Sequence, residues 1–151
     1  MINTYSNIIK LIERLHRHYL DVLRVELHNL GIVDINPVQA LLLSNIGDEN
    51  VVMRDLKDRG YYQGTNVSYN IKSLTSAGYL KQERSRQDKR AVRLTLTDKG
   101  AKLCDMVAGL NKYFAENLGN DPQIIKLFNS ADDALVSLER TFTDFIRFGR
   151  R

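Results

Sequence analysis

The residues that most often carry catalysis or metal binding are few in this chain and are poorly grouped. Its three histidines, His16, His18 and His28, all fall within one predicted helix. His16 and His18 are two positions apart, which is about 200° around a helix, so they do not share a ligand face. The chain has no glycine-rich phosphate-binding loop and no nucleophile elbow. These absences predict that the protein is not an enzyme and has no metal or other cofactor.

The sole cysteine, Cys104, lies on the flank of the apolar face of a helix predicted at 98–118. One interpretation is a small, partly buried apolar side chain. The alternative is an oxidant sensor helped by Lys102, which requires a lowered thiol pKa and access to oxidant. A lone cysteine excludes an internal disulfide. Because the chain also lacks a signal-peptide pattern and a long apolar run, we expect a cytoplasmic protein without a membrane partner.

Basic residues gather in one short stretch. The 151 residues carry a net charge of +4, which is compatible with a polyanionic partner. In the segment 83–90, ERSRQDKR, Asp88 stands between Arg86 and Arg90 and is able to orient one guanidinium. This pattern predicts a loop that contacts a negatively charged partner, with a solvated loop as the alternative. The cations of the segment are Arg84, Arg86, Lys89 and Arg90.

The segment GTNVSYNIKSLTSAG, residues 64–78, predicts a helix with two unlike faces. Val67, Ile71 and Leu74 share one face, and the opposite face has short polar side chains, one cation and no acid. Such a helix suits the DNA major groove, where hydroxyls, amides and a lysine meet base edges and phosphates. The alternative is a solvent-facing helix, but those favour residues of higher helix propensity. The predicted major-groove residues are Thr65, Asn66, Ser68, Tyr69, Lys72 and Ser73.

The elements around these residues form a helix-turn-helix followed by a hairpin. A short helix is predicted at 51–60, and the turn GYYQG joins it to the helix at 64–78, which Thr65 caps. The hydrophobic period then changes to 2, which predicts strands at 79–84 and 91–97. In the second strand Val92, Leu94 and Leu96 face one side, and Ala91, Arg93 and Thr95 face the other. A hairpin at this place predicts a winged helix.

Longer helices are predicted on either side of this region. One covers 3–29, and a second covers 36–47, where Asn36 caps, Pro37 is the first helical residue and Gln39 is the capping-box partner. Thr97 begins the helix at 98–118, and Asp121 and Pro122 begin the last one. The last helix has a heptad seam, which predicts a homodimer formed through both termini. The seam consists of Ile124, Phe128, Ala131, Leu135, Leu138, Phe142 and Phe145.

The segment DKRAVRLTLTDKG, residues 88–100, resembles the wing signature of the MarR family of winged-helix transcriptional regulators. The match rests on Asp88, Arg90, Leu96, Thr97, Lys99 and Gly100. The segments NPVQALLLSNI and VSYNIKSLTSAGYL resemble two further helices of that family. The resemblance implies a mostly α fold with a small β-hairpin wing, and one MarR-like domain over 1–151. Within it, 36–100 would bind DNA and 1–30 and 101–151 would dimerise.

The resemblance also implies a dimeric regulator that binds a pseudo-palindromic operator in double-stranded DNA, most often as a repressor that responds to a small-molecule inducer. Arg54 and Lys57 would hold phosphates. Activation instead of repression stays open, as do a protein-interaction winged helix that does not bind DNA and a redox response through Cys104. An inducer pocket would be lined by Tyr5, His16, Tyr19 and Tyr113, although each of these also suits simple packing.

Overall fold

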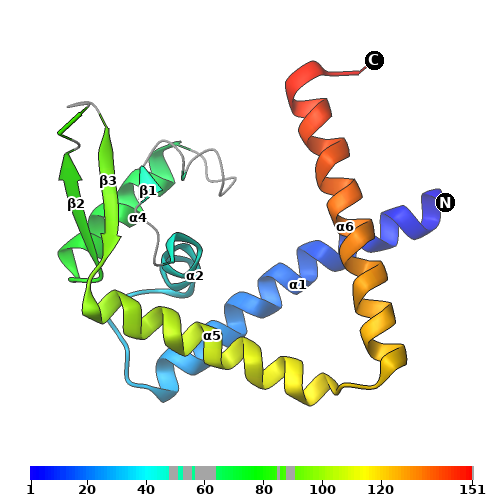
Figure 1. Cartoon of the computed structure of the whole chain (residues 1–151), viewed down its shortest axis with the longest axis horizontal. Coiled ribbons are helices and arrows are strands. Elements are labelled where there is room, and N and C mark those ends of the chain that lie inside the picture. The colour runs from blue at the N-terminus through cyan, green and yellow to red at the C-terminus, as the bar shows by residue number, and fades with distance from the viewer. Residues whose placement is uncertain (48–50, 53–55, 57–63, 85, 88–90, 151) are drawn as a thin grey trace. The chain divides into compact units, whose positions relative to one another are not determined.

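A computed structural model describes residues 1–47, 51–52, 56, 64–84, 86–87 and 91–150 of the chain (Figure 1). The chain divides into two compact units, Met1–Gly109 and Leu110–Arg151. The mostly α fold with a small β-hairpin wing is confirmed. The elements in chain order are α1 (Ile2–Asn29), α2 (Pro37–Ile46), β1 (Val51–Val52), α4 (Gly64–Ser76), β2 (Leu80–Arg84), β3 (Val92–Leu96), α5 (Asp98–Leu118) and α6 (Pro122–Phe148).

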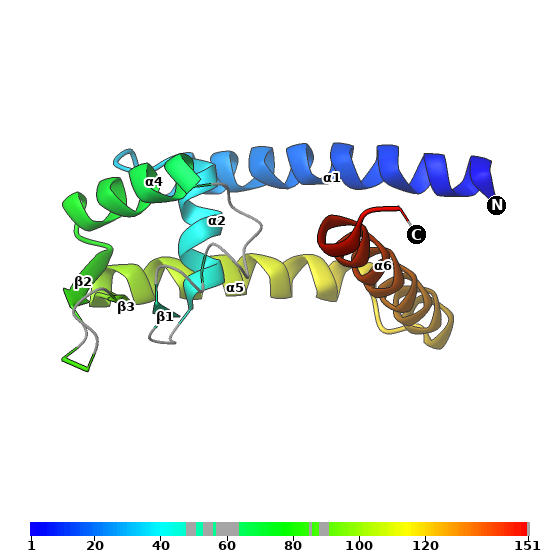
Figure 2. The same ribbon diagram turned by 90° about the horizontal axis from the view of Figure 1, so that it is seen from above.

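The predicted start of α2 is confirmed in detail. The Asn36 side chain accepts a hydrogen bond from the Gln39 amide at 2.8 Å, and the Gln39 side chain accepts one from the Asn36 amide at 3.1 Å. Pro37, which has no amide hydrogen to satisfy, occupies the first turn. Figure 2 shows α2 crossing from α1 toward the first half of α5. The capping box therefore defines where the chain enters the middle of the first unit.

Helix α4 ends in a glycine-based cap. Gly78 has φ +83°, a conformation that side-chain-bearing residues rarely adopt. Its amide donates to the Thr75 carbonyl at 3.1 Å, and the Tyr79 amide donates to the Leu74 carbonyl at 2.9 Å. These two bonds form a Schellman motif, which turns the chain from α4 into β2. At the other end Thr65 lies inside the helix, because α4 begins at Gly64, so the prediction that Thr65 caps it is wrong.

The sheet has the strand order β1-β3-β2, with both pairs antiparallel. The two long strands match the predicted hairpin. The prediction of a helix beginning at Val51 is wrong, since Val51 pairs with Leu94 and Val52 with Arg93. Two consecutive valines are compatible with a helix or with a strand when taken by themselves. They form a strand here because the edge of β3 offers them backbone partners. The rest of the predicted helix lies outside the described residues, except Leu56, which is helical and buried.

One apolar core joins all these elements of the first unit. Leu27 of α1, Leu42 of α2, Ile71 of α4, Leu94 of β3 and Leu103 of α5 belong to one buried cluster. Each is almost completely removed from solvent. Burying a leucine of this size contributes about 2 kcal/mol of transfer free energy. The core therefore holds α4 and the ribbon β2–β3 in one packed unit.

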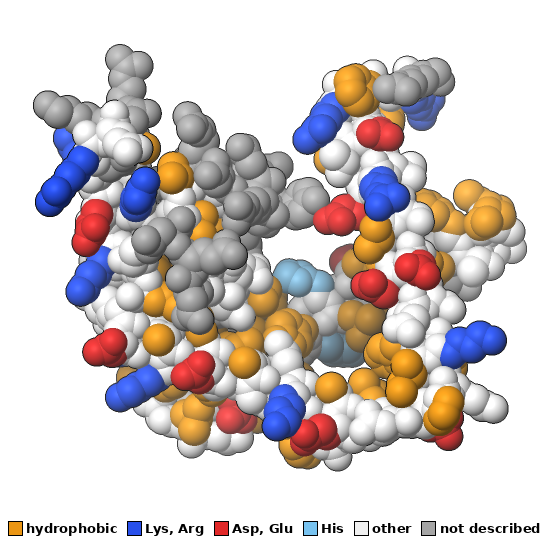
Figure 3. Space-filling view, viewed as in Figure 1, with side chains coloured by type: hydrophobic (Ala, Val, Ile, Leu, Met, Phe, Trp, Pro, Cys, Tyr) orange, Lys and Arg blue, Asp and Glu red, His pale blue; other side chains and the backbone are white. Residues whose placement is uncertain are grey.

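In the second unit, α6 begins as predicted, with Asp121 accepting a hydrogen bond from the Gln123 amide at 2.7 Å. Large apolar side chains of α6 are exposed, among them Phe128, Leu135, Phe142 and Phe145. Figure 3 shows apolar side chains in orange along this helix. Over the described ranges, no helix combines the length and the apolar content that crossing a bilayer requires.

Candidate nucleic-acid interface

Helix α4 has the two faces that its sequence predicts. Val67, Ile71 and Leu74 are buried in the core. On the opposite face, 71% of the Tyr69 surface is exposed, and Ser73 is half-buried at the boundary. The helix thus presents hydroxyls, amides, a phenol and one ammonium group outward, with no carboxylate among them. Asn66, Ser68 and Lys72 are also exposed on this side of α4.

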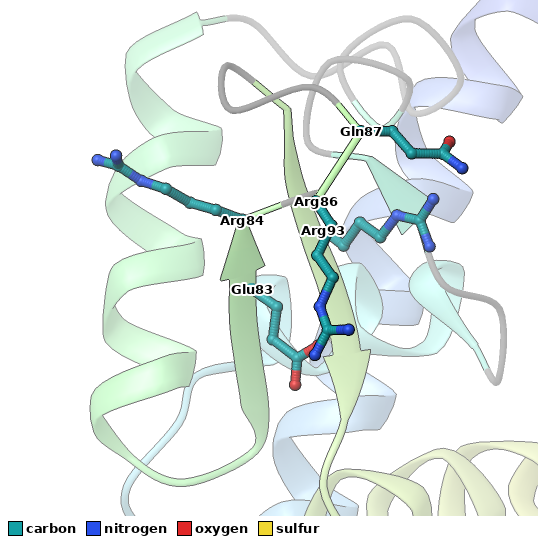
Figure 4. A pocket seen from close by; sticks show the side chains of 5 residues that line it. All are labelled: Glu83, Arg84, Arg86, Gln87 and Arg93. Carbon is teal, nitrogen blue, oxygen red and sulfur yellow. The ribbon is translucent and has the colours of Figure 1, made fainter.

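The register of the ribbon assigns its arginines to opposite faces. Arg84 pairs with Val92, and so shares a face with Gln82 and with the buried Leu94. Glu83 pairs with Arg93 on the other face. Figure 4 shows the Arg84 side chain extending toward α4, while those of Glu83 and Arg93 lie together on the other side. Among the described cations of β2 and β3, Arg84 is therefore the one on the side of α4.

A hydrogen bond ties this face of the ribbon to α4. Gln82 Nε2 donates to Thr75 Oγ1 at 3.0 Å. Thr75 Oγ1 in turn donates to the Ile71 carbonyl at 2.7 Å. Arg84 lies two residues beyond Gln82 on the same face of β2. The Gln82–Thr75 bond therefore fixes the position of Arg84 relative to α4. Sequence analysis missed Gln82, whose partner lies seven residues earlier across the α4–β2 turn.

An open pocket of about 370 Å³ lies at the end of the ribbon (Figure 4). Three of its five lining side chains are arginines, and one is a carboxylate. Sequence analysis assigned Arg84 and Arg86 to the wing contacts, but not Glu83, Gln87 or Arg93. Alternation placed Arg93 on the face opposite Leu94 without showing that Arg86 lies nearby. The lining residues are Glu83, Arg84, Arg86, Gln87 and Arg93.

The LTDKG segment forms a joint between the ribbon and α5. Thr97 Oγ1 donates to the Gly78 carbonyl at 2.6 Å and accepts from the Gly100 amide at 3.1 Å, which confirms Thr97 as the helix cap. The Thr97 amide donates to the Tyr79 carbonyl at 3.1 Å. A Cβ on Gly100 would come within 2.2 Å of that same carbonyl oxygen. Only glycine lets α5 start this close to the end of α4.

Lys99 extends the joint to the loop between α1 and α2. Its Nζ donates to Asp34 Oδ2 at 2.6 Å and to the Ala77 carbonyl at 2.8 Å. The same nitrogen lies 4.3 Å from the centroid of the Tyr79 ring, a cation–π contact. The Tyr79 hydroxyl donates to Asp34 Oδ1 at 2.7 Å. One carboxylate thus collects two donors from elements far apart in the sequence.

These contacts change the acidity of both partners. Burial by itself raises the pKa of Asp34, but the hydrogen bonds from Lys99 and Tyr79 outweigh it, so the pKa of this carboxyl lies below its usual value. Burial and the hydrogen bond to the Asp34 carboxylate raise the pKa of the Tyr79 hydroxyl well above its usual value. The joint is therefore built around an ionised aspartate and a neutral tyrosine.

Several residues predicted to bind DNA lie outside the described residues: Arg54, Lys57, Asp88, Lys89 and Arg90. Thr65 is described only by its place in the backbone of α4. Of the residues predicted to line an inducer pocket, Tyr5, His16 and Tyr19 lie on α1. Tyr113 lies in the second unit, where its ring packs edge-on against Phe114.

Cys104 lies on α5, and the three histidines lie on α1. The half-buried Cys104 packs against the core, and its Sγ lies 3.4 Å from the Leu43 carbonyl oxygen. His16, His18 and His28 are exposed on α1. Across the part of the chain that the structure describes, no three side chains of His, Cys, Asp or Glu gather as metal ligands would.

Residues 35–100 match a family described as "Winged helix DNA-binding domain". A solved structure of Streptococcus pneumoniae FabT in complex with DNA is similar with a TM-score of 0.79, at 21% identity over 91% of this chain and 99% of that one. A MarR family regulator from Listeria monocytogenes, solved with a 26mer DNA, has a TM-score of 0.77 and 22% identity over 95% of both chains.

A curated relative decides the family. The exopolysaccharide II synthesis transcriptional activator ExpG of Rhizobium meliloti is 34% identical over 146 residues, which is 97% of this chain and 75% of the relative. The chain belongs to the MarR family of winged-helix transcriptional regulators. This family consists of DNA-binding regulators and not of enzymes. In this MarR-family chain, the ribbon β2–β3 is the wing of the winged helix.

Proposed function

We propose that this regulator binds a pseudo-palindromic operator as a homodimer, with α4 in the major groove of each half-site and the wing along the adjacent backbone. The observation that carries the proposal is that α4 and the ribbon β2–β3 present their acid-free and basic faces next to each other. The acid-free face of α4 and the Arg84 face of the ribbon are held together by the Gln82–Thr75 bond. Half-sites would then lie about one helical turn apart.

The DNA contacts fall into three groups by their place in the fold. Residues of α4 would meet base edges, residues of the wing would enter or follow the minor groove, and Arg54 and Lys57 would hold phosphates. The domain limits follow, with 36–100 binding DNA and 1–30 and 101–151 dimerising. The α4 residues are Thr65, Asn66, Ser68, Tyr69, Lys72 and Ser73, and the wing residues are Arg84, Arg86, Asp88, Lys89 and Arg90.

Two solved relatives support DNA as the partner. FabT and the Listeria regulator were each solved with DNA, and both share the fold over at least nine-tenths of this chain. The positive net charge agrees with this partner. A winged helix that binds only protein has no need for an acid-free α4 face beside Arg84.

The homodimer rests on α6. Its apolar residues recur at spacings of three and four, and none of the residues of α6 is buried within one chain. An apolar stripe of that length requires a cover, and the seam suits a helix that packs lengthwise. A second copy supplies an identical helix, and two recognition helices match the symmetry of a palindromic site.

The direction of regulation has two candidates. The family resemblance favoured repression that a small-molecule inducer relieves. The Rhizobium meliloti relative is named an activator, and this favours activation for the present chain. A promoter–reporter fusion, assayed with and without the protein, separates them, because a repressor lowers the output and an activator raises it.

The proposal is tested by selecting bound fragments from genomic DNA and sequencing them. A shared inverted repeat should emerge, and a mobility shift on that sequence should weaken steeply as salt rises. Binding that shows no sequence preference at any salt concentration would contradict the operator and favour a protein partner.

A further inference from the structure

Gln39 is a buried polar side chain at the start of α2, with only 5% of its surface exposed. Its Oε1 closes the capping box by accepting from the Asn36 amide. Its Nε2 donates to Asn70 Oδ1 at 3.3 Å. The capping box uses only Oε1 of Gln39, so the hydrogen bond from Nε2 to Asn70 is not part of the cap. One amide group thereby holds the beginning of α2 and a residue of α4 together.

Asn70 lies at the boundary between the two faces of α4. It is half-buried, with the core residue Ile71 after it and the exposed Tyr69 before it. Apolar packing of Val67 and Ile71 resists lifting of the helix but is not directional, and so it tolerates rotation about the helix axis. A hydrogen bond at the edge of the packed face is directional and opposes that rotation.

Rotation of α4 matters because base recognition is short-ranged. A side-chain tip about 5–6 Å from the helix axis moves by about 2 Å when the helix turns by about 20°. Such a shift exceeds the tolerance of a hydrogen bond to a base edge, whereas attraction to phosphates changes little over that distance. A change in the setting of α4 is therefore expected to alter sequence selectivity more than affinity for DNA in general.

We propose that Gln39 is a positioning residue for DNA recognition, which acts through Asn70 to fix the rotation of α4 and thereby the selectivity for the operator. This inference rests on the proposed function, in which α4 enters the major groove. Gln39 itself is buried and does not contact DNA. Through Gln39, the capping box of α2 would affect which bases α4 contacts.

Carboxylate substitutions test the pair directly. In Asn70→Asp, Gln39 Nε2 still has an acceptor, and in Gln39→Glu the carboxylate still caps α2 while the Asn70 amide turns to donate. The double variant places two acceptors against each other and loses the bond. The readout is a selectivity ratio, the dissociation constant for scrambled DNA divided by that for operator DNA of equal length at one salt concentration, because added negative charge weakens both alike.

The expected result is a ratio close to wild type in each single variant and about tenfold lower or more in the double variant, the size of losing one base contact. Asn70→Ala, which leaves the capping box intact, should lower the ratio in the same way and serves if the double variant does not fold. A wild-type protein that discriminates, with both of these variants unchanged in ratio, overturns the inference alone. A wild-type protein that does not discriminate overturns the proposed function and this inference together.

Discussion

Lys99 Nζ lies 2.6 Å from Asp34 Oδ2, so an ion pair joins residues 65 positions apart and fastens the α1–α2 loop to the start of α5. The same ammonium group also binds the Ala77 carbonyl just after α4. The lysine of the wing signature is therefore a structural residue in this chain. It connects the end of α4 to the α1–α2 loop and to the start of α5.

Replacing Lys99 by Met should lower the free energy of unfolding by about 0.5–1 kcal/mol. The value is modest because half of the Lys99 side chain and 41% of that of Asp34 are exposed, so solvent screens the pair. Urea denaturation measures the change. Lys102→Met removes an exposed lysine from the same helix and should have almost no effect. Equal losses in both variants would show that the ion pair contributes nothing.

Stability should depend on pH through the same site. The pKa of Asp34 is lowered in the folded protein, so its contribution is present above the unfolded value of about 3.9 and disappears as the pH falls through the folded value. The pKa of Tyr79 is raised, so its contribution is present below about 10 and is lost at higher pH. Urea midpoints across pH measure both limbs. Asp34→Asn should flatten the acid limb, and an unchanged limb would exclude Asp34 as its source.

Gly100→Ala should destabilise the protein by about 2 kcal/mol or more, because the new Cβ meets the Tyr79 carbonyl oxygen at 2.2 Å and backbone has to move. Gly109→Ala on the same helix is the matched control. Nothing lies within 4 Å of a Cβ at Gly109, and alanine is the better helix former, so that variant should gain about 0.5–1 kcal/mol. Thermal unfolding of both variants decides, and a stable Gly100→Ala protein would contradict the packing of the joint.

Arg84 and Arg93 should contribute unequally to DNA binding, because Arg84 lies on the ribbon face that is directed toward α4 and Arg93 lies on the opposite face. Arg84→Ala is expected to weaken operator binding by about 1 kcal/mol and to reduce the salt slope by about 1. Arg93→Ala removes the same charge from the opposite face and should cost less. Fluorescence anisotropy over a salt series measures both, and the reverse order would assign the DNA side of the wing to the other face.

Phe142→Asp should disrupt the proposed dimer, because it puts a charge into the exposed seam of α6. The dimer dissociation constant is expected to rise by about tenfold or more, and operator binding should fall with it. Ser130→Asp introduces the same charge away from the seam on the same helix and should leave the dimer intact. Sedimentation equilibrium gives the answer, and a wild-type chain that is monomeric at micromolar concentration would contradict the dimer.

Much of the local structure follows from the sequence. The change of hydrophobic period from 3.6 to 2 places the ribbon, and Asn36, Thr97 and Asp121 mark helix starts at the predicted residues. Val51 and Val52 were mistaken for helix because a two-residue strand has no period of its own. Only its partner β3 reveals it.

The sequence by itself determined which residues face the core, where helices begin and that α4 lacks acid, because periodicity, caps and composition act over a few residues. The tertiary structure alone decided that Lys99 meets Asp34, that Gln39 meets Asn70 and that Arg84 stands beside α4 while Arg93 does not. These pairs join distant positions or depend on strand register. Hydrogen bonds and ion pairs act over about 3–4 Å, so chain folding has to bring the partners together before any such contact exists.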